Sequence, residues 1–481
     1  MQMQRRDLLA LGAILLVALA LRIPGLNGPL WFDEITTVAT HLRLPWLQMM
    51  TDYSMNYHYL HDVFAKAFIA VFGEEPWAIR MTALIFGLAS IAAAWALARQ
   101  VAGVPVAHAT ALLLATNYHQ IWFSQNARGY TGLAFFGTVG VILFLRGIAE
   151  PRRSTWLWFG ATLAASVFTH LTGAFLYAAL GLVWLALALG KGGRELWVNP
   201  LLGFLAGGVA TLLLYLPVMP SLIETVGAVS ATSAVDPMQE YQSPLWAAAE
   251  AFRTALGEGN PLIPVAGLLV VALAFTGAVA LRRAAPLFPV IVAVHIALTV
   301  TALMALGMRI WPRFFFVDIA FLMILLVEGV RFLCDRLARA AAGRLGGRVT
   351  ARSLFLPAAA GMVLLSLPLA ARNYRAPKQD LEGAYRFVEA ARRPDERVFA
   401  VGQAASAFTG FYGADWAVLM DGTGYRAAMA RPGPVTFVVA FPGRVFRIIP
   451  QMARDRGTVL TEVKWFPGTL GDGGVAVLRR D

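Results

Sequence analysis

The segment LLALGAILLVALALRIPGLNGPLWFDE (residues 8–34) joins a long apolar run directly to two adjacent carboxylates. The run Leu8–Ile23 follows two arginines, an arrangement typical of a first membrane helix. No small-residue cleavage site follows, because Arg22-Ile23-Pro24 interrupts the run, so we interpret it as a retained helix rather than a removed signal peptide. Asp33 and Glu34 then lie at a membrane surface, where carboxylates are costly to dehydrate and more often functional than decorative.

The composition indicates a protein that is mostly membrane. Of the 481 residues, 58% are hydrophobic and 14% charged, and the mean hydropathy is +0.63. Soluble domains carry about 25% charged residues. The single cysteine, Cys334, excludes an internal disulfide framework and a multi-cysteine metal site. The net charge of +12 does not indicate nucleic acid, because the arginines lie in short clusters between apolar segments.

Hydropathy predicts about 11 membrane spans of roughly 20 mainly apolar residues each. The predicted spans are Leu8–Ile23, Trp77–Ala98, Val104–Phe123, Gly132–Leu145, Trp156–Leu171, Thr172–Leu189, Pro200–Met219, Pro264–Leu281, Pro286–Leu306, Phe314–Leu333 and Leu354–Ala371. We therefore expect an all-α polytopic membrane domain over residues 1–371.

The arginine-rich connections predict the orientation of these spans, because positive charge accumulates on the cytoplasmic side. They are Arg5/Arg6, Arg99, Arg146 with Arg152/Arg153, Lys191/Arg194, Arg282/Arg283 and residues 331–352. The external side then receives residues 27–76, 124–131, 220–262, 307–313 and the C-terminal tail. An odd number of spans places the N-terminus in the cytoplasm and the tail outside.

The sequence also predicts the structure of three connecting segments. Residues 27–76 contain stretches suited to short interfacial helices. Residues 220–262 are rich in Ser, Thr, Pro and Gln and suit a mobile loop over a site. Residues 337–352 suit a basic cytoplasmic loop.

The tail changes character and predicts a small α/β domain over residues 372–481, on the external (periplasmic) face. Asp380–Arg392 has the pattern of a helix. Short buried strands separated by glycine and proline are predicted at Arg397–Val401, Trp416–Met420, Val435–Ala440, Val459–Trp465 and Val475–Leu478.

The acidic pair is the first candidate for chemistry. Asp33 and Glu34 suit either a solvated pair that caps the following helix Ile35–Leu42 or a general base at the membrane surface. A carboxylate accepts a hydroxyl proton when its surroundings keep its pKa useful.

Arg128 is the second candidate, since it lies on the external side, where positive charge is scarce. It lies near the end of the polar stretch NYHQIWFSQNARGY (residues 117–130). An arginine there either extends to lipid phosphates or clamps a substrate phosphate with its planar fork. The neighbouring polar residues Gln125, Asn126 and Tyr130 favour the second alternative, a binding site in which they orient the substrate.

The remaining candidates also fall on the external surface. His58 lies in NYHYLHD (residues 56–62), whose spacing matches no recognised metal-ligand pattern and suits an interfacial aromatic belt as well. His170 is a lone histidine at a helix end, often a structural position. Arg313 and Lys378 flank the last spans and are able to contact a phosphate. Together these residues suit a substrate with an anionic phosphate at headgroup depth and an acceptor hydroxyl arriving from outside.

Several of these motifs together resemble the bacterial membrane glycosyltransferases of the GT-C fold, which are related to protein O-mannosyltransferases and to the aminoarabinose transferase of lipid A. The motifs that carry the resemblance are Trp31–Glu34, Tyr57–Gly73, Phe123–Tyr130, Phe168–His170, Pro312–Phe314 and Lys378–Asp380. The chain departs from the family pattern at His58-Tyr59, where relatives have Pro-Pro, and at Asn126, where they have Glu.

The resemblance implies a polyprenyl-phosphate sugar donor and inverting transfer to a lipid, glycan or protein acceptor, in a bacterial inner membrane. Asp33 would be the base, and Arg128 and Arg313 would stabilise the leaving phosphate. Glu34, His58 and His170 would orient the donor or hold an optional divalent metal; no cofactor is required, and no nucleic acid is involved.

Three alternatives stay open. A transporter or flippase of lipid-linked sugars would share the spans, but it would not need a surface carboxylate. The sequence shows no internal repeat of the kind that transporters often carry. An O-antigen-type ligase or polymerase would use a diphosphate-linked oligosaccharide, and a non-enzymatic assembly subunit would leave the charged cluster without a substrate.

Overall fold

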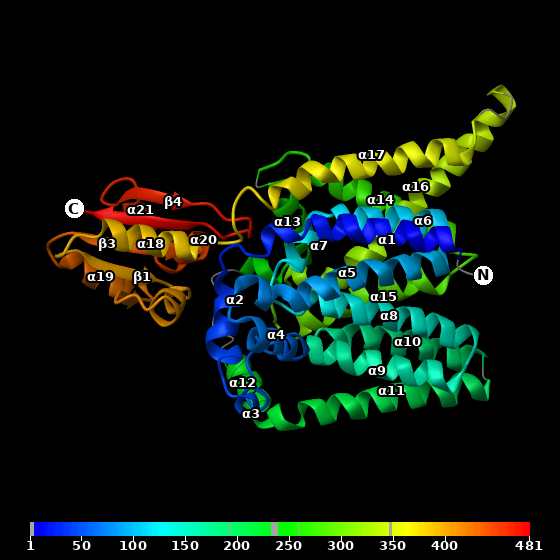
Figure 1. Cartoon of the computed structure of the whole chain (residues 1–481), viewed down its shortest axis with the longest axis horizontal. Coiled ribbons are helices and arrows are strands. Elements are labelled where there is room, and N and C mark those ends of the chain that lie inside the picture. Colours follow the sequence, from blue (N-terminus) through cyan, green and yellow to red (C-terminus); the bar gives the residue numbers. More distant parts are fainter. Residues whose placement is uncertain (1–3, 192, 232–238, 258, 346–348) are drawn as a thin grey trace.

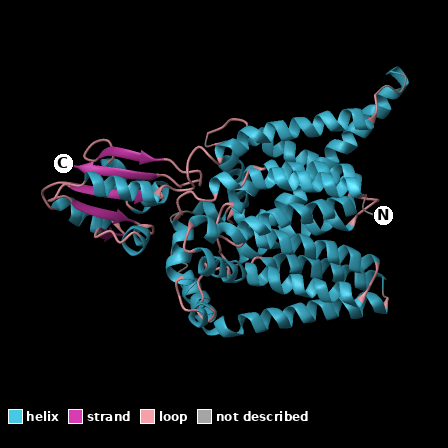
Figure 2. Cartoon of the chain, viewed as in Figure 1, coloured by secondary structure: helices cyan, strands magenta, loops and turns pink. Residues whose placement is uncertain are grey.

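The computed structural model describes residues 4–191, 193–231, 239–257, 259–345 and 349–481. Long helices run side by side in one body, and a sheet flanked by helices projects from one end of it (Figures 1 and 2). Helix α1 begins at the end remote from the sheet, so the start of α1 and the C-terminal strand lie at opposite ends of the molecule (Figure 1).

Each predicted span contains one main apolar helix. These are α1 (Arg5–Ala20), α5 (Pro76–Val101), α6 (Val104–Thr116), α8 (Tyr130–Ala149), α9 (Arg153–Thr169), α10 (Gly173–Lys191), α11 (Arg194–Tyr215), α14 (Ile263–Leu281), α15 (Leu287–Ala305), α16 (Phe316–Leu345) and α17 (Ala351–Arg372). Within the described ranges, 8 are long and apolar enough to cross a membrane; α6 and α9 are shorter, and α16 carries more charge. The chain is a multi-pass membrane protein, and the expected all-α membrane domain is confirmed.

Glycines allow the long helices to approach closely. A Cβ atom on Gly277 of α14 would collide with the Leu325 carbonyl of α16, and one on Gly329 would collide with the Leu273 carbonyl. Helices α9 and α11 meet in the same way at Gly160. Small residues at such crossings let backbones pack tightly, which is how membrane helices gain van der Waals contact without a hydrophobic driving force.

Shorter elements cover the end of the bundle that faces the sheet (Figure 1). They are the 3₁₀ helix η1 (Ile23–Gly25), α2 (Phe32–Thr37), the π-helical turn η2 (Val38–Leu42), α3 (Trp46–Met49), α4 (Tyr59–Phe72), α7 (Tyr118–Ser124), the 3₁₀ turns η3 (Leu216–Val218) and η4 (Gln239–Gln242), α12 (Met219–Ala231), α13 (Pro244–Leu256) and the 3₁₀ turn η5 (Pro312–Phe315).

Three sequence expectations differ from these elements. The span 104–123 breaks at Asn117, whose extended backbone and side chain cap α7 by accepting from the Gln120 N–H at 3.0 Å. The expected loop 220–262 holds α12 and α13, because Ser243 caps a helix that begins with Pro244; residues 232–238 and 258 lie outside the described residues. The expected basic loop 337–352 is helical as far as Leu345, since its alanines and arginines are good helix formers.

The C-terminal sheet has the strand order β2-β1-β3-β5-β4. Its strands are β1 (Arg397–Val401), β2 (Ala417–Leu419), β3 (Val435–Ala440), β4 (Thr461–Phe466) and β5 (Val475–Arg480). β1 pairs parallel with β2 and β3, whereas β5 pairs antiparallel with β3 and β4. β3 lies at the centre and is buried along its whole length, as a strand covered on both faces should be.

Helices flank this sheet. α18 (Leu381–Ala391) begins at Asp380, whose carboxylate accepts from the Gly383 N–H at 2.9 Å. The sequence predicted this helix, but it did not predict α19 (Gly422–Ala430), α20 (Pro442–Ile448), α21 (Pro450–Asp455) or the π-helical turn η6 (Ala407–Phe411).

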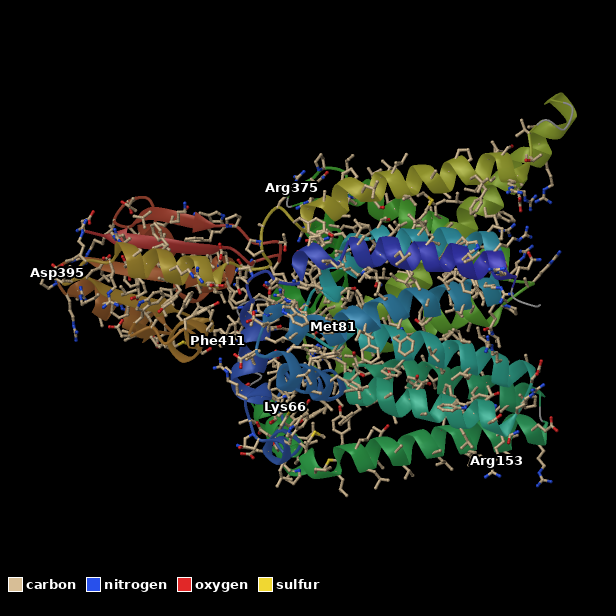
Figure 3. All side chains as sticks on the ribbon, viewed as in Figure 1. Lys66, Met81, Arg153, Arg375, Asp395 and Phe411 are labelled. Atoms are coloured by element: carbon tan, nitrogen blue, oxygen red, sulfur yellow. The ribbon has the colours of Figure 1, made fainter. Side chains whose placement is uncertain are left out.

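The sheet region rests on the covering elements near α2. The ring of Phe32 meets that of Phe441 edge-on at 5.7 Å between centroids. Trp122 Nε1 donates to Thr469 Oγ1 at 3.2 Å, and the Phe32 N–H donates to Gln379 Oε1 at 3.3 Å. Figure 3 shows Arg375 and Phe411 at this boundary, with Arg153 at the opposite end of the bundle. The start of α2 therefore lies where the two regions meet.

Candidate functional site

The two carboxylates of the acidic pair face different partners. Both lie in the first turn of α2. Asp33 Oδ2 lies 3.4 Å from Arg313 Nη1, and this side chain keeps 16% of its surface exposed. Glu34 is fully buried and pairs with Arg80 at 2.6 Å. Only Asp33 of the pair is open to a substrate.

Glu34 fixes the position of α2 through hydrogen bonds to its carboxylate. Its oxygens accept from Arg80 Nε at 2.8 Å, from the Ala127 N–H at 2.7 Å and from the Trp31 N–H at 3.2 Å. Burial raises the pKa of this carboxyl, but Arg80, Lys378 and the Ala127 N–H outweigh burial and hold the pKa below its ordinary value. The ionised carboxylate ties the start of α2 to α5 and to the turn before α8.

Arg128 reaches the same face of α2 as Asp33. Its Nη1 donates to Thr37 Oγ1 at 3.1 Å and to the Asn56 carbonyl at 2.5 Å. Thr37 lies four residues after Asp33, so the two side chains share one helix face. Asn56 Nδ2 also donates to Thr37 Oγ1 at 3.0 Å and to the Asp33 carbonyl at 3.2 Å. The sequence did not predict Thr37 or Asn56, although the four-residue spacing from Asp33 was a usable signal for Thr37.

Two imidazoles and a tyrosine ring complete this group. The ring centroids of His58 and His170 are 4.7 Å apart, and Tyr130 lies 5.1 Å from His58 and 5.3 Å from His170. Gly129 makes the approach possible, because a Cβ atom there would lie 2.8 Å from His58 Nδ1. We call this group the Asp33 cluster; it comprises Asp33, Thr37, Asn56, His58, Arg128, Tyr130, His170 and Arg313.

Both histidines of the Asp33 cluster are neutral near pH 7. Burial, with Arg128 and Arg313 nearby, lowers the pKa of His170 to about 3. Burial, followed by Arg128 and His170, holds the pKa of His58 well below its ordinary value. The positive charge of the cluster therefore resides on its two arginines.

Several buried polar atoms of the Asp33 cluster have no partner in the described parts of the chain. They are the donors Arg128 Nε and Arg313 Nε and the two ring nitrogens of His58, of which one donates and one accepts in the neutral imidazole. Native structures satisfy most buried polar groups, so a concentration of unpaired donors indicates a missing partner. Two guanidinium groups against one carboxylate leave an excess of positive charge. The cluster therefore suits an anionic ligand with several acceptor oxygens.

A second buried network positions His58. The Asp62 carboxylate accepts from the His58 N–H at 3.0 Å and lies 2.8 Å from His41 Nδ1 and 2.9 Å from His61 Nδ1. Although burial opposes ionisation, the two imidazoles lower the pKa of Asp62. His41 and Asp62 were not among the predicted site residues, but the spacing of His58 and Asp62 at a helix start was a signal.

Three predicted site residues make their contacts elsewhere. Lys378 Nζ donates to the Gln125 carbonyl and lies 5.4 Å from the ring centroid of Trp122. Gln125 Nε2 donates to the Arg22 carbonyl at 2.8 Å. Asn126 Oδ1 accepts from Trp31 Nε1 at 2.9 Å. The structure thus brings together Asp33, Arg128, Arg313, His58, His170 and Tyr130, and it places Lys378, Gln125 and Asn126 beside Glu34.

The side chains near the Asp33 cluster can be compared with the requirements of a metal site. Among the described residues, no group of three or more His, Cys, Asp or Glu side chains is placed to hold a metal ion. His58 and His170 lie together, but Asp62 is already occupied by hydrogen bonds to His41 and His61.

Comparisons with known proteins agree with this architecture. Residues 59–223 match the family described as dolichyl-phosphate-mannose-protein mannosyltransferase. ArnT from Cupriavidus metallidurans, solved with undecaprenyl phosphate, is 15% identical with a TM-score of 0.54, and 97% of each chain is covered. The archaeal oligosaccharyltransferase AglB from Archaeoglobus fulgidus, solved with an inhibitory peptide and a dolichol-phosphate, is 12% identical with a TM-score of 0.52; 98% of this chain and 74% of that chain are covered.

A further structure of the Archaeoglobus fulgidus oligosaccharyltransferase, with Zn and sulfate, is 13% identical with a TM-score of 0.54 over 90% of this chain and 68% of that chain. No curated protein sequence matches significantly. The fold is therefore that of the GT-C membrane glycosyltransferases. Within that class, the chain is similar to the protein mannosyltransferases and to ArnT, as the sequence motifs predicted.

Proposed function

We propose that this protein is a glycosyltransferase that moves a sugar from a polyprenyl-phosphate donor to a hydroxyl acceptor. The single observation that carries the proposal is the Asp33 cluster, in which an accessible carboxylate lies beside the Arg313 guanidinium, and Arg128 and Arg313 both keep an unpaired Nε donor. A transferase of this kind needs both a proton acceptor and a phosphate site. The relatives solved with undecaprenyl phosphate and with a dolichol-phosphate support this donor class.

In this proposal Asp33 is the general base. The acceptor hydroxyl gives its proton to Asp33 as its oxygen bonds to the anomeric carbon of the sugar. The bond from that carbon to the phosphate oxygen breaks on the opposite face, so the configuration inverts. Arg128 and Arg313 stabilise the charge that develops on the leaving polyprenyl phosphate.

The other cluster residues orient the donor. His58, His170 and Tyr130 present uncharged rings to the sugar. The two unpaired ring nitrogens of His58 are available for hydrogen bonds to the sugar or the phosphate. Glu34 acts through α2, as a positioning residue that holds Asp33 in place, and Asn126 and Gln125 anchor the turn that presents Arg128. A divalent metal is an optional addition that this scheme does not require.

We also propose the membrane arrangement. The arginine-rich connections lie at the end remote from the sheet, as Arg153 does in Figure 3, and this end would be cytoplasmic in a bacterial inner membrane. The Asp33 cluster and the domain formed by residues 372–481 would then face the periplasm. A lipid, a glycan or a protein would reach Asp33 from that side.

Transfer by the purified protein tests the proposal. Radiolabelled polyprenyl-phosphate sugars would be supplied one at a time with extracted membrane lipids, glycans and proteins. A labelled product from one donor supports the transferase. Product only from a diphosphate-linked oligosaccharide would favour a ligase, whereas tight donor binding with no product, together with movement of the donor across proteoliposome membranes, would favour a flippase.

A further inference from the structure

A cavity lies outside the Asp33 cluster, where the membrane body meets the C-terminal domain. It has a volume of about 320 Å³, at the lower end of the range of ligand pockets. Residues from η1, from the end of α7, from the segment that follows α17 and from the loop before β5 line it. None of its lining residues belongs to the Asp33 cluster. We call it the junction pocket.

The junction pocket is positively charged. Arg80, Arg375 and Lys378 line it, and no Asp or Glu is found among its lining residues. Glu34 already neutralises Arg80, whose donors also reach the carbonyls of Gly28 and Pro29. The charge available to a ligand therefore comes from Arg375 and Lys378.

Lys378 is a buried residue of the pocket wall, not a surface lysine. Its side chain is only 8% exposed and lies 5.4 Å from the ring centroid of Trp122. An ammonium group has three donors, and one of them is used by the Gln125 carbonyl. Burial followed by Arg80 lowers the pKa of Lys378 to about 7, a cost that an anion beside it would relieve.

The pocket has further unpaired groups at its mouth. Arg375 is exposed. Asn373 Oδ1 is buried without a hydrogen-bond partner in the described parts of the chain. This acceptor suits a ligand that also carries a proton or hydroxyl, as hydrogen phosphate does. Ile23 and Tyr374 lie nearby, just beyond the ends of α1 and α17, and are 55% and 40% exposed, so apolar surface adjoins the mouth.

We infer that the junction pocket binds a phosphate group, as a second anion site beside the one in the Asp33 cluster. The ligand carries a phosphate group, either as a lipid headgroup that enters from the membrane or as free phosphate. Arg375 and Lys378 would contact its oxygens directly. The Glu34–Arg80 pair lies between this site and the start of α2, which carries Asp33.

Calorimetric titration of the purified protein in a non-ionic detergent tests this inference. The probes are inorganic phosphate and dihexanoyl phosphatidic acid, without any sugar donor. The wild type should bind two equivalents of at least one probe. The double variant Arg128→Gln/Arg313→Gln should keep the site in the junction pocket and lose the other.

Arg375→Gln and Lys378→Met should each weaken binding to the remaining site about tenfold or more, because a charge-assisted hydrogen bond is lost. Matched substitutions in the C-terminal domain, Arg426→Gln and Lys464→Met, should change nothing. Arg375 is exposed, so its variant should fold even if Lys378→Met does not. Binding of the lipid alone assigns a headgroup site, and binding of inorganic phosphate assigns a site for free phosphate.

Unchanged affinity in both Arg375→Gln and Lys378→Met would overturn the inference. So would loss of all binding in Arg128→Gln/Arg313→Gln protein that melts as the wild type does. Because no donor or acceptor is present, these results do not depend on whether the protein transfers a sugar.

Discussion

Arg128 and Arg313 both bring a guanidinium into the Asp33 cluster, but only Arg313 lies beside a carboxylate. The Arg313 and Asp33 side chains are 30% and 16% exposed and 3.4 Å apart, so their pairing is weak and solvent-screened. Arg128 instead contacts a hydroxyl and a carbonyl, and its Nε is unpaired. Both arginines thus keep most of their binding capacity for an anion.

Replacing Arg128 with Gln should weaken the binding of polyprenyl phosphate about tenfold to a hundredfold, because one charge-assisted pair is lost. The measurement is inhibition of transfer by added polyprenyl phosphate, with purified wild type and variant compared. Arg146→Gln, at an exposed position at the opposite end of α8, is the control. Equal inhibition constants in wild type and Arg128→Gln would contradict the assigned phosphate site.

The lowered pKa values of His58 and His170 predict the pH dependence of the free enzyme. A histidine with a lowered pKa stays neutral above that pKa and gains charge only below it, so His170, with a pKa of about 3, should not titrate between about pH 5 and about pH 8. The profile of kcat/KM over this window should keep its shape in His170→Gln, although its height falls. Disappearance of an inflection near pH 6.5 in that variant would show that His170 titrates and would contradict the account.

At the scale of elements, α2 is a helix of 6 residues that is too short to be stable alone. Glu34 fixes it from one side through Arg80 and the Ala127 N–H, and Asn56 fixes it from the other. The position of Asp33 therefore depends on contacts that are distant in sequence.

Glu34→Gln should cost roughly 3–5 kcal/mol of stability, because it leaves the buried Arg80 without its counter-charge. The matched control is Glu74→Gln, whose ion pair with Arg43 is half-exposed and should contribute less than about 1 kcal/mol. Thermal unfolding in detergent measures both. A melting temperature of Glu34→Gln as high as that of Glu74→Gln would contradict the bracing role.

Element prediction succeeded where composition alone decides structure. The spans followed from apolar length, and β1 and β3 were predicted to the residue because buried β-branched runs stand between turn signals. Prediction failed at the Asn117 break and in residues 220–262, where a single capping side chain outweighs the pattern. Helices α19, α20 and α21 are short, and packing on the sheet rather than propensity sustains them.

The site shows the same division. Asp33, Arg128 and Arg313 were predicted because charge on the external side has no topogenic explanation, whereas the roles of His58 and His170 came from the family resemblance. The sequence could not separate Glu34 from Asp33, since the two differ only by their direction from a six-residue helix. Nor could it place Lys378, whose neighbours Gln125 and Trp122 come from a segment some 250 residues earlier.

At the scale of the whole molecule, the Asp33 cluster and the C-terminal domain lie at one end of the bundle and the arginine-rich connections at the other. Figure 3 shows Asp395 and Arg153 far apart along this direction. Polyprenyl donors and external acceptors would meet at the Asp33 end.

The orientation is tested by thiol labelling in intact cells of a Cys334→Ser background. Asp395→Cys should react with a membrane-impermeant maleimide, and Arg153→Cys should react only after the membrane is permeabilised, since both positions are exposed. The reverse pattern would place the Asp33 cluster in the cytoplasm.

The most direct test of the central claim is the rate of sugar transfer by Asp33→Asn from a preformed donor complex. We expect a loss of about 10²–10⁴-fold, the contribution of a general base, with donor affinity within about threefold of the wild type. Asp52→Asn, in the same external region, should transfer normally. A rate for Asp33→Asn equal to that of the wild type would contradict the account, because the Asp33 cluster would then contain no base.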